Sequence, residues 1–448
     1  MNATVAADAA GELATVDGLT HEGEGVVHAG KTVFVAGALP GERIRLRRTR
    51  RHRQHDDGEL IEVLQSSPVR VTPRCAHFGV CGGCALQHLV PEAQLAAKEQ
   101  ELKDCLERVA KVTPGRWLAP LAGPAWGYRR RARLGAKFVR KKERVLVGFR
   151  ERAAPYVAQL ANCEVLKKPA GDLIAPLAAM LTGLTIREHL PQIEVAVADN
   201  VTALVLRVLK DPPSEDLARL SAFAAAHQVR FYLQPAGLDS VRPLGPAGEA
   251  LRYALPHFDL QLEFEPTDFI QVNGAINEAL VSRALELLAP AADSRVLDLF
   301  CGLGNFTLAL ARHVAHVVGV EGDGALIARA RGNAHLNGIT NTEFHAGNLA
   351  VAPLAHSSPW LRQPYSHVLL DPPRTGAREV LAAVAALAPR RVLYISCHPG
   401  SLARDLGVLV HEHGLTLEAA GVVDMFPHTA HVESLALLSG PARTAAAA

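Results

Sequence analysis

The stretch RVLDLFCGLGNF, residues 295–306, decides the fold of the C-terminal half of this chain. It begins as a short apolar strand, turns at Gly302 and Gly304, and continues in a helical pattern. Three further apolar segments end in a similar way, in VVGVEG (317–322), HVLLDPP (367–373) and RVLYISC (391–397). Helical patterns separate these segments between Asn273 and Leu438, and this alternation predicts an α/β fold with a parallel, doubly wound sheet.

Polar residues stand where the predicted strands end, which is the edge at which open α/β sheets bind ligands. Glu321 is placed to accept hydrogen bonds from both ribose hydroxyls of an adenosine, which suits NAD as well as S-adenosylmethionine. A dinucleotide fingerprint has a third glycine further along the first loop, but the chain has Asn305 and Phe306 there. Because S-adenosylmethionine has no phosphate, this departure favours it. Asn348, suited to the adenine edge, and Asp371 complete the predicted cofactor site.

The residue after the Asp-Pro-Pro sequence bears on which atom is methylated. Amine methylases need an aromatic residue there to stack the base, and this chain has Arg374. A carbon target is therefore considered. Carbon 5 of uracil is a poor nucleophile until a thiolate adds to carbon 6. Cys397 ends the strand RVLYISC at the ligand edge, so its position favours a nucleophile over the buried structural thiol that is usual for a lone cysteine. Cys301 lies in the glycine turn, where we expect it to pack.

A general base must remove the proton from carbon 5 after methyl transfer. Glu433, in the segment HTAHVESLALL, is the candidate, although an exposed acidic residue at the start of a strand fits the same pattern. RNA cytosine-5 methyltransferases carry a cysteine in the motif that corresponds to Asp-Pro-Pro. This chain has none there, which favours uracil.

Three cysteines, Cys75, Cys81 and Cys84, lie within ten positions, with Gly82 and Gly83 between the last two. Such a bunch suggests a metal site in a reducing compartment rather than a disulfide framework. Cys163, in LANCEV, is the best candidate for a fourth ligand. Four thiolates hold zinc or a 4Fe-4S cluster, and the number of ligands does not decide between them.

The net charge of +2 hides two dense basic blocks. Seven arginines lie between Arg43 and Arg53, and nine of the sixteen residues from Arg129 to Arg144 are Arg or Lys. Each block could be a solvated face, but two blocks of one sign, separated from the acidic residues in the sequence, favour a polyanion partner. No apolar run is long enough to span a bilayer and no signal peptide begins the sequence, so we expect a cytoplasmic protein.

The pattern of apolar and polar residues along the sequence predicts three domains and a tail. Short alternating segments over residues 1–70 predict a small β-barrel. Residues 71–265 are mixed α and β, with an amphipathic helix between Glu92 and Val112 that places Cys105 in a core. Residues 266–440 form the predicted methyltransferase domain, and residues 441–448 a disordered tail.

Several motifs carry a resemblance to a known family. The run GEGVVHAGKTVFVAGALPGERIRLRR (23–48), with its Pro-Gly-Glu turn, resembles a TRAM domain, an OB-like RNA-binding barrel. Together with CAHFGVCGGC, WGYRRRARL, FIQVN, DLFCGLGNF, DPPR, YISC and HVESLALL, it makes the chain resemble the RNA uracil-5-methyltransferases, and among them the group that methylates bacterial 23S ribosomal RNA.

The resemblance implies a set of roles. Cys397 would be the nucleophile and Glu433 the base, the metal would be a 4Fe-4S cluster on Cys75, Cys81, Cys84 and Cys163, and no obligate protein partner is implied. S-adenosylmethionine would contact Gln271, Phe300, Asn305, Glu321, Asn348 and Asp371. The family usually has Asn after the nucleophile, and this chain has His398, whose imidazole can still donate a hydrogen bond.

Three alternatives remain open. The relative that acts on transfer RNA lacks both the barrel and the cysteine cluster, so their presence favours ribosomal RNA. A second ribosomal site, served by a shorter relative, is harder to exclude. An RNA-binding module with a vestigial catalytic half is disfavoured by the complete catalytic set.

Overall fold

The computed structural model describes residues 11–351 and 358–440, so the tail predicted at 441–448 lies outside the described residues. Residue contacts group the chain into two compact units. The first comprises the residues up to Glu101 with Arg150–Tyr156 and Phe426–His431, and the second comprises Leu102–Phe149, Val157–Met425 and the residues from Val432 onward. The three-domain division remains a sequence prediction. Among the helices of the described residues, none has the length and apolarity needed to cross a membrane.

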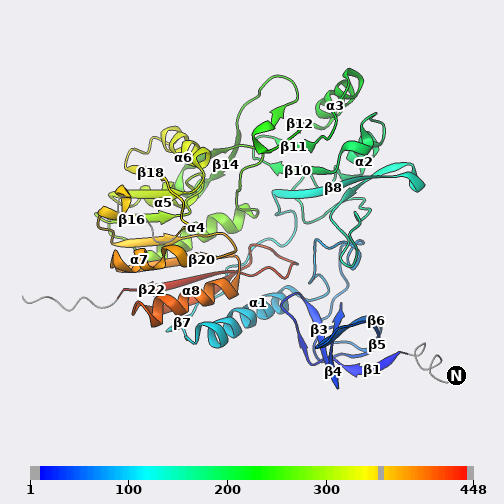
Figure 1. Ribbon diagram of the computed structural model, residues 1–448, viewed down its shortest axis with the longest axis horizontal. Helices are drawn as coiled ribbons and strands as arrows, with labels where there is room; N and C mark the ends of the chain where they lie inside the picture. Colours follow the sequence, from blue (N-terminus) through cyan, green and yellow to red (C-terminus); the bar gives the residue numbers. More distant parts are fainter. Residues whose placement is uncertain (1–10, 352–357, 441–448) are drawn as a thin grey trace, which may run out of the picture. The chain divides into compact units, whose positions relative to one another are not determined.

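The first unit contains a six-stranded sheet in the region where the alternating segments predicted a small β-barrel (Figure 1). Its order is β1-β5-β6-β4-β3-β2, antiparallel except for the parallel pair β4 and β6. Inward-facing residues such as Val27, Val33, Val35 and Ile44 form its buried core, as the alternation of a half-buried strand requires. The strands are β1 (Glu12–Thr15), β2 (Gly18–Leu19), β3 (Glu24–Ala29), β4 (Lys31–Ala36), β5 (Arg43–Arg51) and β6 (His55–Gln65).

The first basic block lies on β5, and several of its arginines are neutralised by neighbouring strands. Arg45 pairs with Glu62, Arg47 with Glu59, and Arg48 with Glu12 and Asp56. In the folded sheet this block is therefore not separated from acidic residues, although it is separated from them in the sequence. Strand order explains this difference, because β1 and β6, which carry the acidic partners, flank β5 in the sheet.

The predicted amphipathic helix is present as α1 (Pro91–Cys105), continued by a π-helical turn η1 (Leu106–Ala110). Leu102 and Leu106 are buried in the core of the second unit, and Cys105 packs against that core as expected.

The second unit contains a six-stranded sheet of order β13-β12-β11-β10-β8-β9. The second basic block lies on β8 and the turn after it. Arg130 pairs with Asp199, and Arg131 and Arg133 pair with Glu194, so these three arginines also have carboxylate partners. The elements are β8 (Arg131–Val139), β9 (Arg144–Gly148), β10 (Gln192–Val197), β11 (Thr202–Arg207), β12 (Val229–Gln234) and β13 (Arg242–Pro243), with helices α2 (Ile174–Thr182) and α3 (Ser214–His227).

The main sheet of the second unit has eight strands in the order β18-β17-β16-β19-β20-β22-β21-β7. The strands from β18 to β20 are parallel and run outward in both directions from β16, as a doubly wound fold requires. The predicted parallel, doubly wound arrangement is present in these strands, whereas β22, which the prediction did not distinguish, is antiparallel to both β20 and β21. The strands are β7 (Arg116–Trp117), β16 (Arg295–Leu299), β17 (His316–Glu321), β18 (Thr342–Ala346), β19 (His367–Leu370), β20 (Arg391–Ser396), β21 (Thr416–Val423) and β22 (Glu433–Ser439).

Helices cover this sheet and enclose a large apolar core. They are α4 (Gly274–Leu288), α5 (Asn305–Ala311), α6 (Gly324–Leu336), α7 (Leu381–Ala386) and α8 (Pro399–His411). Short 3₁₀ turns are η2 (Arg140–Lys142), η3 (Arg187–His189), η4 (Leu238–Ser240), η5 (Pro256–Phe258), η6 (Pro359–Arg362) and η7 (Arg378–Val380).

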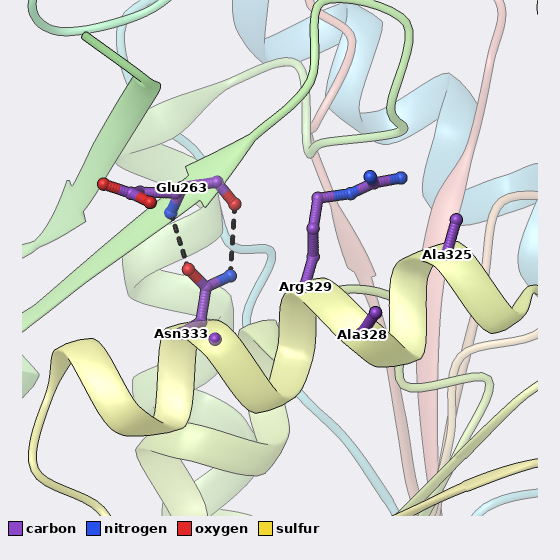
Figure 2. A pocket seen from close by; sticks show the side chains of 6 residues that line it. Glu263, Ala325, Ala328, Arg329 and Asn333 are labelled. Carbon is purple, nitrogen blue, oxygen red and sulfur yellow. Dashed lines mark hydrogen bonds between the residues drawn. The ribbon is translucent and has the colours of Figure 1, made fainter. Parts of the chain in front are cut away.

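A hairpin of β14 (Leu251–Leu255) and β15 (Leu260–Phe264) is fastened to α6 by two asparagines. Figure 2 shows the Asn333 amide donating to and accepting from the backbone of Glu263, at 3.1 and 2.8 Å. Asn337 makes the same pair of bonds with Gln261, at 2.7 and 2.9 Å. The helix that follows Glu321 is thereby held against the hairpin beside a small hollow lined by Glu263, Ala325, Ala328, Arg329, Gly332 and Asn333.

Candidate active site

The loop after β16 has a conformation that leaves space above it. Phe300 adopts a positive φ of 64°, which is uncommon for a non-glycine residue and concentrates at functional sites. The N–H groups of Phe300 and Cys301 both donate to the carbonyl of Val320, at 2.9 and 3.1 Å, and hold the turn on β17. A Cβ atom added at Gly302 would meet no atom within 4 Å. The glycine turn is thus anchored from below and open on its other side.

Glu321 is fixed at the end of β17 by backbone donors. Its carboxylate accepts hydrogen bonds from the N–H groups of Gly302, Gly322 and Asp323, at 3.1, 2.7 and 3.1 Å. Two oxygens with about four acceptor positions still leave capacity for a ligand hydroxyl. The ribose contact of Glu321 remains a prediction.

Asp298 is a buried carboxylate that the sequence did not single out. Its Oδ2 accepts from the Thr307 hydroxyl at 2.5 Å, while its Oδ1 has no hydrogen-bond partner among the described residues. Burial, together with the negative charges of Asp371 and Glu321, raises the pKa of Asp298 to about 7, against the effect of the hydrogen bond from Thr307. The sequence feature that could have identified Asp298 is an acidic residue near the end of a predicted strand that leads into a glycine turn.

Asp371 directly follows β19 and lies at the same edge of the sheet. Burial raises the pKa of Asp371 to about 7, against the effect of a weak hydrogen bond from Gln271 Nε2 at 3.4 Å. The structure therefore brings together Gln271, Asp371 and Glu321 from the predicted cofactor set. Three carboxylates at this edge favour a ligand that carries positive charge.

Two predicted cofactor residues have other partners. The Asn305 amide exchanges two hydrogen bonds with the Asn277 amide, both 2.9 Å, and accepts from the Tyr253 hydroxyl at 3.0 Å. Asn348 is exposed, and its Oδ1 accepts from the N–H of Ala350 at 3.0 Å. Both residues follow their strands as expected, but these contacts are within the protein.

Cys397 and Glu433 come together at the junction of the parallel and antiparallel parts of the sheet. The last pair in register between β20 and β22 is Ser396 with Ser434, so Cys397 and Glu433 stand at the next facing positions. Burial, together with the charges of Glu433 and Asp371, raises the pKa of Cys397 to about 11, against the effect of Arg374.

Glu433 is 4% exposed, which excludes an exposed surface carboxylate. Burial raises its pKa well above the ordinary value, and the charge of Asp371 adds to the effect. A carboxylate with a raised pKa is a stronger base than an exposed one once it is ionised.

Ser401 links the loop after β19 to the loop that carries the nucleophile. Its buried hydroxyl lies 3.0 Å from the carbonyl of Arg374 and 3.0 Å from that of His398. His398 is the N-cap of α8, and its Nδ1 accepts from the N–H of Ser401 at 3.1 Å. Nδ1 of the imidazole therefore acts as an acceptor here, and Nε2 is the ring nitrogen that can still donate, as the sequence analysis expected. Asn is among the preferred N-cap residues, so His398 keeps a capping role that Asn also fills.

The buried carboxylate of Asp405, on α8, makes a second group of hydrogen bonds that hold the loop after β19. Its carboxylate accepts from the Tyr394 hydroxyl at 2.6 Å and from the N–H of Ala377 at 2.7 Å. Arg404 donates to the carbonyl of Thr375 at 2.8 Å. The segment after the Asp-Pro-Pro sequence is therefore tied to α8 at several points.

In the first unit, the cysteine segment forms a tight loop. The N–H of Cys81 donates to the carbonyl of His77 at 2.9 Å, and the N–H of Gly83 points to the Cys81 sulfur at 3.4 Å. A Cβ atom at Gly82 would come within 3.0 Å of the backbone oxygen of Arg150, so a larger residue would not fit without movement. Cys75, Cys81 and Cys84 are all half-buried, as is Cys163 in the second unit.

Comparison with known proteins supports the resemblance to the uracil-5-methyltransferases independently of the site geometry. Residues 256–440 match the family model described as tRNA (Uracil-5-)-methyltransferase. Two relatives called 23S rRNA (uracil(1939)-C(5))-methyltransferase RlmD come from Alkalilimnicola ehrlichii and Stenotrophomonas maltophilia. The first is 50% identical over 96% of both chains, and the second is 49% identical over 94% of this chain and 95% of the relative.

The fold has a counterpart among solved structures. The Pyrococcus abyssi tRNA (uracil-54, C5)-methyltransferase, solved in complex with S-adenosyl-L-homocysteine, superposes with a TM-score of 0.73 over 95% of this chain and 100% of that one. At 22% identity this likeness shows the shared fold. The near full-length identity to the curated relatives shows more: this chain is a member of the RlmD family of 23S rRNA (uracil-C5)-methyltransferases.

Proposed function

We propose that this enzyme transfers a methyl group from S-adenosylmethionine to carbon 5 of one uridine in 23S ribosomal RNA, through a covalent bond between Cys397 and carbon 6. The single observation that carries the mechanism is the placement of Cys397 and Glu433 at facing ends of β20 and β22, at the edge of the sheet where the glycine turn opens. Because the relatives are named for methylation of uracil 1939, uridine 1939 is the expected target.

The residues at the strand ends fit S-adenosylmethionine. This cofactor supplies an electrophilic methyl group on a positively charged sulfur. Glu321 offers acceptor capacity for the ribose hydroxyls, and the unpaired oxygen of Asp298 together with Asp371 offers negative charge for a cationic group. We assign the predicted set of Gln271, Phe300, Asn305, Glu321, Asn348 and Asp371 to this site, and add Asp298 as a residue that shapes its charge.

Cys397 acts on the RNA base. Its thiol loses a proton, the thiolate sulfur bonds to carbon 6 of uracil, and the electron pair of the ring double bond moves toward oxygen 4. Carbon 5 then takes the methyl group as the sulfur–methyl bond of S-adenosylmethionine breaks and S-adenosylhomocysteine is left, and carbon 5 still carries its hydrogen. Because the pKa of Cys397 is about 11 in the protein alone, few chains hold a thiolate at neutral pH. Binding of the uracil base and the approach of positively charged groups would therefore have to lower the pKa of Cys397.

Glu433 completes the reaction. Its carboxylate takes the proton from carbon 5, the double bond forms again, and the sulfur–carbon 6 bond breaks to release the methylated base and the thiolate. A buried carboxylate with a raised pKa suits the removal of a proton from carbon, which is a weak acid.

We further propose that Cys75, Cys81 and Cys84 hold a 4Fe-4S cluster, with Cys163 as the fourth ligand that the sequence predicts. The loop suits a thiolate cluster because a backbone N–H is directed at the Cys81 sulfur and Gly82 permits close approach of the backbone. When bound, such a cluster would link these cysteines to one another through iron. The test is iron, sulfide and zinc analysis after anaerobic purification of the wild type and of Cys163→Ser. Stoichiometric zinc without iron in the wild type would overturn the cluster, and full iron in the variant would overturn the fourth ligand.

The activity itself is tested by mapping 5-methyluridine in ribosomal and transfer RNA from a deletion strain. The strain is complemented with the wild type or with Cys397→Ala. We expect one ribosomal modification to disappear on deletion and to return only with the wild type. Loss of a transfer RNA modification instead would favour the activity named for the structural relative. Methylation restored by Cys397→Ala would refute the covalent mechanism.

A further inference from the structure

The hairpin of β5 and β6 carries a cluster of metal-ligating side chains that the methylation reaction does not use. His52 lies in the turn, while His55 and Asp57 lie at the start of β6. One potential ligand atom from each residue lies within 4.8 Å of the other two. This cluster of His52, His55 and Asp57 is separate from the cysteine loop in the sequence and in its ligand chemistry.

The three side chains converge because the hairpin holds them. The N–H of His52 donates to the carbonyl of His55 at 3.0 Å, which closes the turn. The two imidazole rings stack with centroids 4.5 Å apart, and Phe34 packs against His55 at 5.0 Å. His52 Nε2 lies 3.0 Å from one oxygen of Asp57, and His55 Nε2 lies 4.0 Å from the other. Both nitrogens thus face one carboxylate.

The surrounding charges leave Asp57 available to a cation. Its neighbour Asp56 takes the nearby cationic side chains, accepting from Lys31 at 2.7 Å and from Arg48 at 2.9 Å. Among the described residues, the two histidines are the partners within 4.0 Å of the Asp57 carboxylate that can carry positive charge. Arg50, Arg51 and Arg53 are exposed, so solvent and salt screen their repulsion of a bound ion.

We propose that His52, His55 and Asp57 bind a divalent transition-metal ion of the zinc class. Two imidazoles and one carboxylate form a ligand set that suits zinc, cobalt or nickel, and water would complete the coordination. All three side chains are partly exposed, so an ion can reach them from solvent. A bound ion would join the turn to β6 and fix the tip of the arginine-bearing hairpin. The inference does not depend on the methylation chemistry.

Zinc is the probe. Tag-free, full-length protein is dialysed against dilute Zn²⁺, and the metal bound per chain is measured for the wild type, His55→Ala and Asp57→Asn. The cysteines are the same in all three proteins and contribute equally. We expect each variant to bind one zinc ion fewer than the wild type. Equal zinc in all three proteins would overturn the site.

His28→Ala is the matched control, because His28 lies on the same sheet and pairs with a single carboxylate, Asp17, at 3.1 Å. It should keep the zinc of the wild type, and an equal loss in this variant would also overturn the site. A Co²⁺ titration gives a second readout. Nitrogen and oxygen ligands produce visible absorption without the thiolate charge-transfer band of a cysteine site. Circular dichroism checks folding, and His52→Gln replaces any variant that does not fold.

Discussion

Cys397 and Glu433 occupy facing positions at the ends of two antiparallel strands, one step beyond the Ser396–Ser434 pair. The Ser434 hydroxyl donates to the carbonyl of Ser396 at 3.2 Å and fastens the strands beside them. An ionised Glu433 raises the cost of ionising Cys397, because two negative charges in a poorly solvated site repel. Only one of them needs to be ionised at each step of the proposed reaction, first the thiolate and later the carboxylate.

Glu433→Gln should trap the reaction after methyl transfer. Without a base for the carbon 5 proton, the sulfur–carbon 6 bond cannot break, so protein and RNA remain joined. A denaturing gel with labelled RNA should show a slowly migrating band in this variant. The double variant Cys397→Ala, Glu433→Gln should lack that band. Normal turnover by Glu433→Gln without an adduct would contradict its role as the base.

The same variant should change the acidity of the nucleophile in the absence of RNA. Near the pKa of about 11, an ionised Glu433 disfavours the thiolate, so Glu433→Gln should lower the pKa of Cys397. Each unit of decrease raises the thiolate fraction about tenfold but lowers its intrinsic reactivity, leaving a gain of about threefold in alkylation rate.

Iodoacetamide labelling of the Cys397 peptide, followed by mass spectrometry across a pH series, measures this change. Glu418→Gln is the control, because Glu418 lies exposed on the neighbouring strand β21 and should leave the midpoint unchanged. A midpoint in Glu433→Gln at or above that of the wild type would show that Glu433 does not act on the thiol.

The sequence was sufficient to predict which residues lie at the ligand-binding edge of the sheet. It was not sufficient to predict the ion-pair partners of the charged residues. Glycines, Asp371 and Cys397 were placed correctly at strand ends, because an apolar run followed by a turn marks where a strand stops. Strand direction carries no such mark, since a buried strand is apolar whichever way it runs. The antiparallel β22 was therefore missed, although Glu433 was correctly expected at the start of a strand.

Charge partners are set by strand order, which local patterns do not contain. The partner of Arg131 is Glu194, which lies on a strand 63 residues away in the sequence. His398 shows the same limit on a smaller scale. A histidine at this position departs from the family pattern. The structure is needed to show that its side chain still caps α8, by accepting a backbone hydrogen bond.

The RNA-binding role of the second basic block should reside at its exposed turn rather than in its ion-paired arginines. Lys141 and Lys142 are exposed in η2, and neither has a carboxylate within 4.0 Å among the described residues. The double variant Lys141→Gln, Lys142→Gln should weaken RNA binding and reduce its salt dependence, by up to about 2 in the slope of log K against log salt. Filter binding across a salt series measures both. Lys210→Gln, an exposed lysine elsewhere in the unit, should change neither, and an unchanged slope in the double variant would make the turn a solvated face.

The buried carboxylate of Glu42 should matter more for stability than any surface ion pair of the first unit. It accepts from Arg70 Nε at 2.5 Å and from the N–H groups of Leu39 and Ser67 at 2.9 and 3.1 Å. Burial opposes ionisation, but these hydrogen bonds outweigh it and hold the pKa of Glu42 below its ordinary value. Its stabilisation is therefore present above the pKa of an unfolded glutamate and is lost as the pH falls toward the lower, folded value.

Glu42→Gln should lower the free energy of unfolding by about 3 kcal/mol, because it leaves Arg70 without its charged partner. Glu59→Gln is the matched control, since Glu59 pairs with Arg47 at 2.5 Å but both side chains are about half exposed. An exposed pair of this kind contributes about 0–1 kcal/mol. Urea denaturation of the full chain near neutral pH, followed by fluorescence, compares the two midpoints. Equal midpoints would mean that the hydrogen bonds of Glu42 do not depend on its charge.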